Sequence, residues 1–155
     1  MEISGKAAVV VGGASGMGRA SAELLATRGA RVAILDRETS DGPAVAEGIG
    51  GWFTPVDVTD FAGTETALAS AVEALGGLHV CVTTAGGGIG KRTLAKDGPH
   101  SLDEFRSVID LNLVATFNVS RLAASHMVKN DPVDADADDH GVEVARRVSA
   151  RGRPS

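Results

Sequence analysis

Three glycines near the start of the chain stand where a phosphate-binding turn would need them. Gly12, Gly16 and Gly18 lie between a short apolar run and an amphipathic stretch, in the order Val-Gly-Gly-Ala-Ser-Gly-Met-Gly-Arg over residues 11–19. Glycine at such a junction allows a tight turn and the close approach of a pyrophosphate, whose charge is attracted by the free N–H groups of the following helix. The GxxxGxG spacing differs from the GxGxxG fingerprint, so an ordinary tight turn is an equal alternative for this motif alone.

Acidic and polar residues follow the later apolar runs of the chain. Asp36 ends the second run, Asp57 follows the third and Thr84 ends the fourth. The carboxyl ends of parallel strands form the ligand-binding edge of an open α/β sheet, and an acid after the second strand can accept hydrogen bonds from ribose hydroxyls. A helix cap or a solvated turn is the alternative for Asp36 and for Asp57. Together with the glycines, the arrangement favours a dinucleotide site.

The elements that would position these residues alternate regularly. Apolar runs predict four strands, and amphipathic stretches predict the helices between them. The expected strands are 7–11, 31–35, 52–56 and 78–84, and the expected helices are 16–28, 41–49, one capped by Thr59 or Asp60 that runs to about 75, and a long one from about 101. Strands this apolar need cover on both faces, which predicts an α/β fold with a doubly wound, Rossmann-type parallel sheet. With about four strands, the sheet is expected to be incomplete.

The long helix carries a continuous apolar stripe. Its members recur three or four residues apart, which in a globular protein is the pattern of a helix face turned toward the core. They are Leu102, Phe105, Ile109, Leu113 and Phe117. Ser101, with Glu104 three residues later, predicts a capping box at the start of this helix.

The composition of the chain excludes several other classes of protein. The 155 residues include one Cys and carry a formal net charge of −5, which excludes a disulfide framework and argues against a nucleic-acid partner. The four His are scattered and predict no metal site. The first apolar run is too short to span a bilayer and lacks the flanks of a signal peptide, so we expect no membrane partner and a cytoplasmic location.

Residues 131–155 differ from the rest of the chain. They include six acidic residues and four arginines but no Leu, Ile or aromatic residue. Such a segment cannot bury enough apolar surface to offset the entropy of ordering. We therefore expect a dinucleotide-binding domain over residues 1–130 and a divergent, disordered tail over residues 131–155.

These motifs resemble those of the classical short-chain dehydrogenase/reductase family, whose TGxxxGxG motif has Thr where this chain has Val11. The likeness covers about residues 3–132 and is greatest to the type II 3-hydroxyacyl-CoA dehydrogenase branch, also called 17β-hydroxysteroid dehydrogenase type 10. The likeness rests on Asp57-Val58-Thr59 and on residues 101–127. The family's Asn-Asn-Ala-Gly is replaced by Thr-Thr-Ala-Gly over residues 83–86. The resemblance implies a cofactor site made by Gly12, Ser15, Gly16, Met17, Gly18, Asp36, Asp57, Val58, Thr84, Ala85 and Gly86.

The cofactor that this resemblance implies is NAD. Asp36 would bind a ribose 2′-hydroxyl and repel the 2′-phosphate of NADP, although Arg37 next to it could soften that preference.

The same resemblance implies catalytic residues that this chain does not contain. Family members use a Ser and a Tyr-x-x-x-Lys motif, supported by an Asn that Asn112 matches, and the chain has no Tyr. The resemblance implies an oxidoreductase lineage that moves hydride between NAD and a secondary alcohol or ketone, such as a 3-hydroxyacyl thioester or a steroid, with a small-molecule substrate only in a complete homologue. The alternative is a non-catalytic nucleotide-binding fragment or pseudoenzyme. Because the likeness stops near Pro132, we expect a truncated or frameshifted reading frame.

The missing segments also affect the expected sheet. In the family's strand order the fourth strand is central, and the absent fifth strand lies beside it. Residues 78–84 are therefore expected to form a bare apolar edge that promotes self-association, and the long helix is expected to lose part of its cover.

Overall fold

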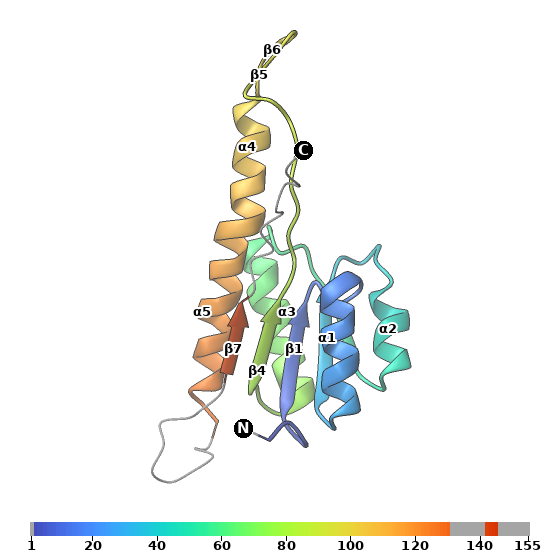
Figure 1. Ribbon diagram of the computed structural model, residues 1–155. Helices are drawn as coiled ribbons and strands as arrows, with labels where there is room; N and C mark the ends of the chain where they lie inside the picture. The colour runs from blue at the N-terminus through green and yellow to red at the C-terminus, as the bar shows by residue number, and fades with distance from the viewer. Residues whose placement is uncertain (1, 131–141, 146–155) are drawn as a thin grey trace.

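The four apolar runs pair side by side in a parallel sheet, to which a fifth strand is added (Figure 1). The computed structural model describes residues 2–130 and 142–145 of the chain. The strands are β1 (Ala7–Val11), β2 (Arg31–Asp36), β3 (Trp52–Pro55), β4 (Val80–Thr83) and β7 (Val142–Ala145), in the order β3-β2-β1-β4-β7. All four pairings are parallel, so the carboxyl ends of the strands meet at one edge.

Helices cover both faces of this sheet. α1 (Gly16–Thr27) and α2 (Gly42–Gly48) pack on one face, and α3 (Phe61–Leu75) and α5 (Ala115–Met127) pack on the other. Successive residues of β1 alternate between the two layers: Val10 joins the core on the α1 side, while Val9 and Val11 join the core on the α3 side. Since both faces are dry, every residue of β1 must be apolar. The predicted doubly wound, Rossmann-type fold is confirmed.

Both ends of α3 are formed by residues that the sequence indicated. Of the two candidate caps, Asp60 is the N-cap, and its Oδ1 accepts the N–H of Gly63 at 3.0 Å. Gly76 ends the helix with φ of 69°, a left-handed conformation that strains any residue with a side chain.

The fifth strand corrects two expectations about the C-terminal segment. The composition of residues 131–155 predicted no strand there, yet β7 pairs with β4 in parallel from Val80↔Val142 to Thr83↔Ala145. The β4 edge is therefore covered and cannot carry the expected self-association. Four residues are too few to show a period, which is why the pattern missed β7, although Val142 and Val144 favour a strand. The other residues of the predicted tail lie outside the described part of the chain.

The long helix is one rod with an irregular centre. α4 (Leu102–Ile109) runs through a π-helical turn, η1 (Asp110–Val114), into α5, and it extends well beyond the sheet (Figure 1). Ser101 Oγ accepts the N–H of Glu104 at 3.3 Å, which is one half of the predicted capping box. The other half does not form, because the Glu104 carboxylate pairs with Lys91 instead. A hairpin of β5 (Leu94–Ala95) and β6 (Gly98–Pro99), which no sequence pattern predicted, precedes α4.

The apolar stripe of this rod faces outward rather than toward the core. Leu102, Phe105, Leu113 and Phe117 expose 59%, 53%, 52% and 67% of their surface. The buried side of α5 is made instead by residues such as Val119. Within the described residues, this face of the helix is uncovered. In the part of the chain that the structure describes, no helix has the length and apolarity to cross a membrane.

Stability should fall at mildly acidic pH because of His79, at the amino end of β4. Its Nδ1 accepts the N–H of Ala7 at 3.2 Å. Burial lowers the pKa of His79, and the nearby cations Lys6 and Arg31 lower it further. The unfolded chain therefore binds more protons than the folded protein once the pH drops below about 6.5. We expect the free energy of unfolding, measured in urea between about pH 8 and pH 5, to decrease toward acid.

His79→Asn is the matched variant, because its amide oxygen can accept the Ala7 N–H without titrating. This variant should make the free energy of unfolding less dependent on pH. Part of the decrease in the free energy of unfolding toward acid should remain until His126→Asn is added, because burial also lowers the pKa of His126. If the variant with both substitutions lost as much stability toward acid as the parent protein, this account would be wrong.

Candidate functional site

The turn between β1 and α1 is built by close backbone contacts. The N–H of Gly12 donates to the carbonyl of Leu35 at 2.8 Å, which ties the turn to the end of β2. A Cβ on Gly12 would lie 2.5 Å from the backbone nitrogen of Ala85, and a Cβ on Gly18 would lie 2.1 Å from the carbonyl oxygen of Gly12. Two of the three predicted glycines are therefore required by packing: they let β1, α1 and the end of β4 converge.

The amino end of α1 is free to bind an anion. Ser15 is the N-cap residue, but its side chain makes no capping hydrogen bond. Gly16 has φ of 52°, and a Cβ built on it would meet open space. The first N–H groups of the helix and its positive dipole end thus point to an open position, which suits a phosphate group.

Asp36 connects the end of β2 to the same turn. Its Oδ2 accepts the N–H of Ala14 at 2.9 Å, and its Oδ1 accepts the N–H of Arg37 at 2.8 Å. Each carboxylate oxygen has a second lone pair, so both can still accept a hydrogen bond from a bound hydroxyl.

Asp57 is held in its ionised form at the end of β3. Its Oδ1 accepts the N–H of Thr59 at 2.9 Å and the Thr59 hydroxyl at 2.7 Å. These hydrogen bonds lower the pKa of Asp57; partial burial opposes the shift, and the charge of Arg37 supports it. A second carboxylate therefore stands at the edge of the sheet near Asp36.

The Thr84 side chain connects the end of β4 to the end of β1. Its hydroxyl lies 3.1 Å from the carbonyl oxygens of both Val11 and Gly12, and its N–H donates to Val11 at 2.8 Å. The Thr that replaces an Asn of the family motif thus fastens the glycine turn to the neighbouring strand.

These strand ends surround a cavity of about 550 Å³ at the carboxyl edge of the sheet. Of the predicted cofactor residues, eight line it, whereas Gly16, Met17 and Gly18 do not. The eight are Gly12, Ser15, Asp36, Asp57, Val58, Thr84, Ala85 and Gly86. The prediction missed residues from the rod and the loop before it, because no motif marks them. These are Gly87, Gly88, Ile89, Ser107, Val108 and Leu111.

Asn112, expected to support catalysis, lies in η1 and does not line the cavity. Its Nδ2 donates to the carbonyls of Gly87 at 2.7 Å and Val108 at 2.8 Å, and its Oδ1 accepts the N–H of Gly87 at 3.1 Å. The amide therefore holds the glycine-rich segment after β4 against the rod. A catalytic contribution of Asn112 stays a prediction.

No group of three or more His, Cys, Asp or Glu side chains suited to a metal ion occurs within residues 2–130 and 142–145. The site is instead a glycine turn, an open helix end and two carboxylates at the carboxyl edge of a doubly wound sheet. These features define a nucleotide-binding protein of the Rossmann type.

The chain belongs to the short-chain dehydrogenase family, whose sequence model, described as short chain dehydrogenase, matches residues 6–133. It is 42% identical over 134 residues to 3-hydroxyacyl-CoA dehydrogenase type-2 of Homo sapiens, an alignment that covers 84% of this chain and 51% of that protein. The chain thus spans about half the length of the curated relatives it matches.

Solved structures agree with this assignment. A dehydrogenase/reductase from Sinorhizobium meliloti 1021 superposes with a TM-score of 0.72 and 34% identity over 81% of this chain and 51% of that one. A short chain dehydrogenase from Burkholderia cenocepacia J2315, crystallised in complex with NADP, gives a TM-score of 0.69 and 32% identity, covering 81% of this chain and 52% of its own. The family binds a nicotinamide dinucleotide.

The packing of the turn can be tested with two glycine variants. Gly18→Ala should lower the free energy of unfolding by roughly 1–3 kcal/mol, because the new methyl group would overlap the Gly12 carbonyl. Gly48→Ala is the control: it lies in α2 with open space around its Cβ position, so it should leave stability unchanged or slightly raised. Urea unfolding measures both. Equal stabilities for the two variants would count against the packing role.

Proposed function

We propose that this chain binds NAD in the cavity at the carboxyl edge of its sheet. The observation that supports this most directly is the convergence of Gly12, Ser15, Asp36 and Thr84, from three different strand ends, around one space of about 550 Å³. A cavity of this size is typical of a cofactor site.

The chain's own groups suit the parts of a dinucleotide. The open amino end of α1 and the turn at Gly12 would hold the pyrophosphate. Asp36 would accept hydrogen bonds from the adenosine ribose, and its negative charge would disfavour a 2′-phosphate. Asp57 and Val58 line the same cavity beyond Asp36. The Burkholderia cenocepacia relative was crystallised with NADP, so the affinities of this chain for NAD and NADP are to be measured side by side.

The proposed role of the 155-residue chain is binding and not turnover. When bound, the nicotinamide supplies the hydride acceptor or donor of the family's chemistry. The lineage suggests a secondary alcohol or ketone as substrate of the whole protein, of the 3-hydroxyacyl-CoA or steroid type. This chain has no Tyr to serve as the family's proton donor. Positioned acid–base groups contribute about 10²–10⁴-fold to a rate, so their loss leaves a binding site.

The preference for NAD should depend on the charge of Asp36. Titration calorimetry of the parent chain should give tighter binding of NAD than of NADP. Asp36→Asn keeps an oxygen for the Ala14 N–H but removes the charge, so the ratio of the two affinities should shift toward NADP by about tenfold or more, equivalent to roughly 1.4 kcal/mol.

Asp41→Asn provides the control, because it removes the same charge from a residue that does not line the cavity. The ratio of its affinities for NAD and NADP should equal that of the parent chain. Tighter binding of NADP than of NAD by the parent chain would overturn the NAD assignment, and binding of neither would overturn the site.

Turnover by the purified chain should be undetectable. Incubation with NAD and 3-hydroxyacyl-CoA or steroid alcohols should give no rise in reduced-nicotinamide absorbance above a protein-free blank. The human 3-hydroxyacyl-CoA dehydrogenase type-2, assayed in parallel, serves as the positive control. Substrate-dependent reduction of NAD by the 155-residue chain would refute the proposed role.

A further inference from the structure

The polar side chains around the cavity form two groups, which belong to different strand ends. Ser15, Asp36 and Arg37 follow β1 and β2, and they are here called the β2 end of the cavity. Thr84 and Ser107, with the neighbouring Asn112, belong to β4 and the rod, and they are here called the β4 end. The strands β2 and β4 lie on opposite sides of β1, so the two groups flank the glycine turn.

The hydrogen-bond donors of the β4 end are already used within the protein. The hydroxyl of Thr84 lies 3.1 Å from each of the two carbonyl oxygens at the end of β1, to which it donates its one proton. The hydroxyl of Ser107 donates to a carbonyl of its own helix at 2.8 Å. The amide nitrogen of Asn112 donates to two carbonyls, at 2.7 and 2.8 Å. None of these side chains has a proton left for the carboxamide oxygen of a nicotinamide ring.

The β2 end keeps its capacity to bind a ligand. Each carboxylate oxygen of Asp36 accepts one backbone N–H and has a second lone pair left. The side chain of Ser15 does not cap α1, so the first N–H groups of that helix remain available to an anion. The side chain of Arg37 lines the cavity and forms no ion pair within the described residues. Phosphate groups and a ribose thus find donors, acceptors and positive charge here.

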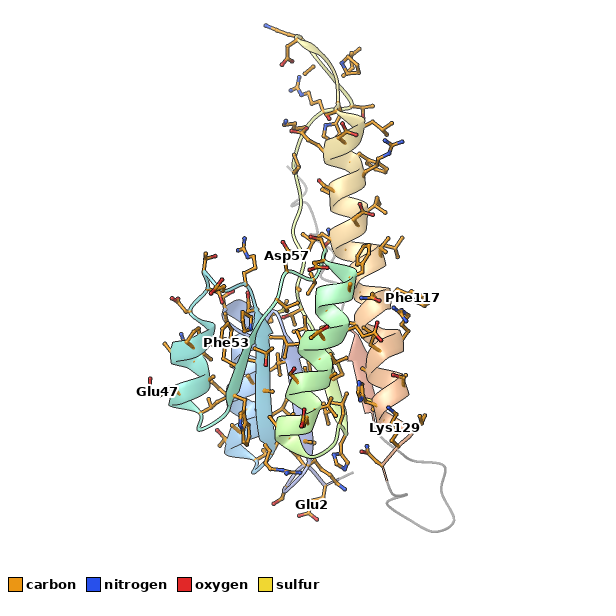
Figure 2. All side chains as sticks on the ribbon, turned by 180° about the vertical axis from the view of Figure 1, so that it is seen from behind. Glu2, Glu47, Phe53, Asp57, Phe117 and Lys129 are labelled. Atoms are coloured by element: carbon orange, nitrogen blue, oxygen red, sulfur yellow. The ribbon has the colours of Figure 1, made fainter. Side chains whose placement is uncertain are left out.

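Apolar side chains continue this end of the cavity toward β3. Leu35, Val56 and Val58 line the cavity and are themselves buried. Figure 2 shows Asp57, which lies between the two valines in the sequence, at this edge of the sheet. A purine ring that packs against such side chains gains free energy from the burial of apolar surface.

The three kinds of group follow one another in the order of the strands. The open helix end comes after β1, the carboxylate of Asp36 ends β2, and the apolar lining follows β3. These strands are direct neighbours in the order β3-β2-β1. Phosphate, ribose and base are joined in the same order in adenosine 5′-diphosphate, so this part of a dinucleotide can use all three kinds of group at once.

We propose that the cavity recognises the adenosine 5′-diphosphate group, so that ADP-ribose and ADP bind about as tightly as NAD and the nicotinamide ring adds little to the affinity. The proposal rests on the proposed function, because it places the ligand in the same cavity. It extends that function to a wider class of ligand, namely compounds that contain adenosine diphosphate, with or without a nicotinamide.

Titration calorimetry of the full 155-residue chain with NAD, ADP-ribose, ADP and nicotinamide mononucleotide tests the proposal. The dissociation constants of ADP-ribose and ADP should lie within about fivefold of that of NAD, and nicotinamide mononucleotide should show no binding. A larger advantage of NAD over either compound, or binding of nicotinamide mononucleotide, overturns the inference and leaves the proposed NAD site standing. Absence of binding by all four compounds overturns the NAD site, and the inference with it.

Saturation-transfer NMR of NAD in the presence of the chain gives a second measurement, because it reports which protons of the ligand contact the protein. The adenine protons should receive more saturation than the nicotinamide protons. Equal saturation of the two rings, or stronger saturation of the nicotinamide, overturns the inference.

A matched pair of variants tests the part played by the β2 end. Asp36→Asn should weaken the binding of NAD and of ADP-ribose by the same factor, because both ligands carry the adenosine ribose and a charged acceptor makes the stronger hydrogen bond. Asp41→Asn should change neither affinity, because Asp41 does not line the cavity. If Asp36→Asn weakened the binding of NAD alone, the proposal would be wrong.

Discussion

The structure depends on the burial of β1 between β2 and β4. Each residue of this strand is dry on both sides, so the strand can only form inside a sheet that has helices on both faces. Its carboxyl end is where Gly12, the end of β2 and the end of β4 meet. The contact is so close that a single methyl group at Gly12 or Gly18 would overlap backbone or hydroxyl atoms. The same close backbone contacts therefore determine both the packing of the strands and the shape of the site.

The polar groups around this meeting point have two roles. Asp36 and Thr84 hold the turn through hydrogen bonds to Ala14 and to the carbonyls of Val11 and Gly12, and they also line the cavity. A ligand therefore meets groups that are already fixed by the fold, which reduces the entropy lost on binding. This preorganisation comes from hydrogen bonds and packing within the described residues.

The two sides of the rod differ in their contacts. The inner side of α5 packs against α3, β4 and β7 and is buried, while the outer side of the rod carries large apolar residues that no described segment covers. Helical spacing correctly identified an apolar face but not what that face contacts, because α5 turns a second set of residues, among them Val119, Leu122 and Ala123, toward the core. An apolar period shows which side of a helix is apolar, and only the tertiary structure shows what that side contacts.

By itself, the sequence determined the fold class, the four apolar strands, Gly76 as the end of α3 with Thr59 or Asp60 as its start, and eight of the residues that line the cavity. It did so because strands, caps and glycine turns are set by local chemistry within a few residues. Only the tertiary structure decided that β7 covers β4, that Asn112 clamps Gly87, that Ser107, Val108 and Leu111 join the cavity, and that the stripe faces outward. Each of these depends on contacts between segments far apart in the chain, for which no local pattern exists.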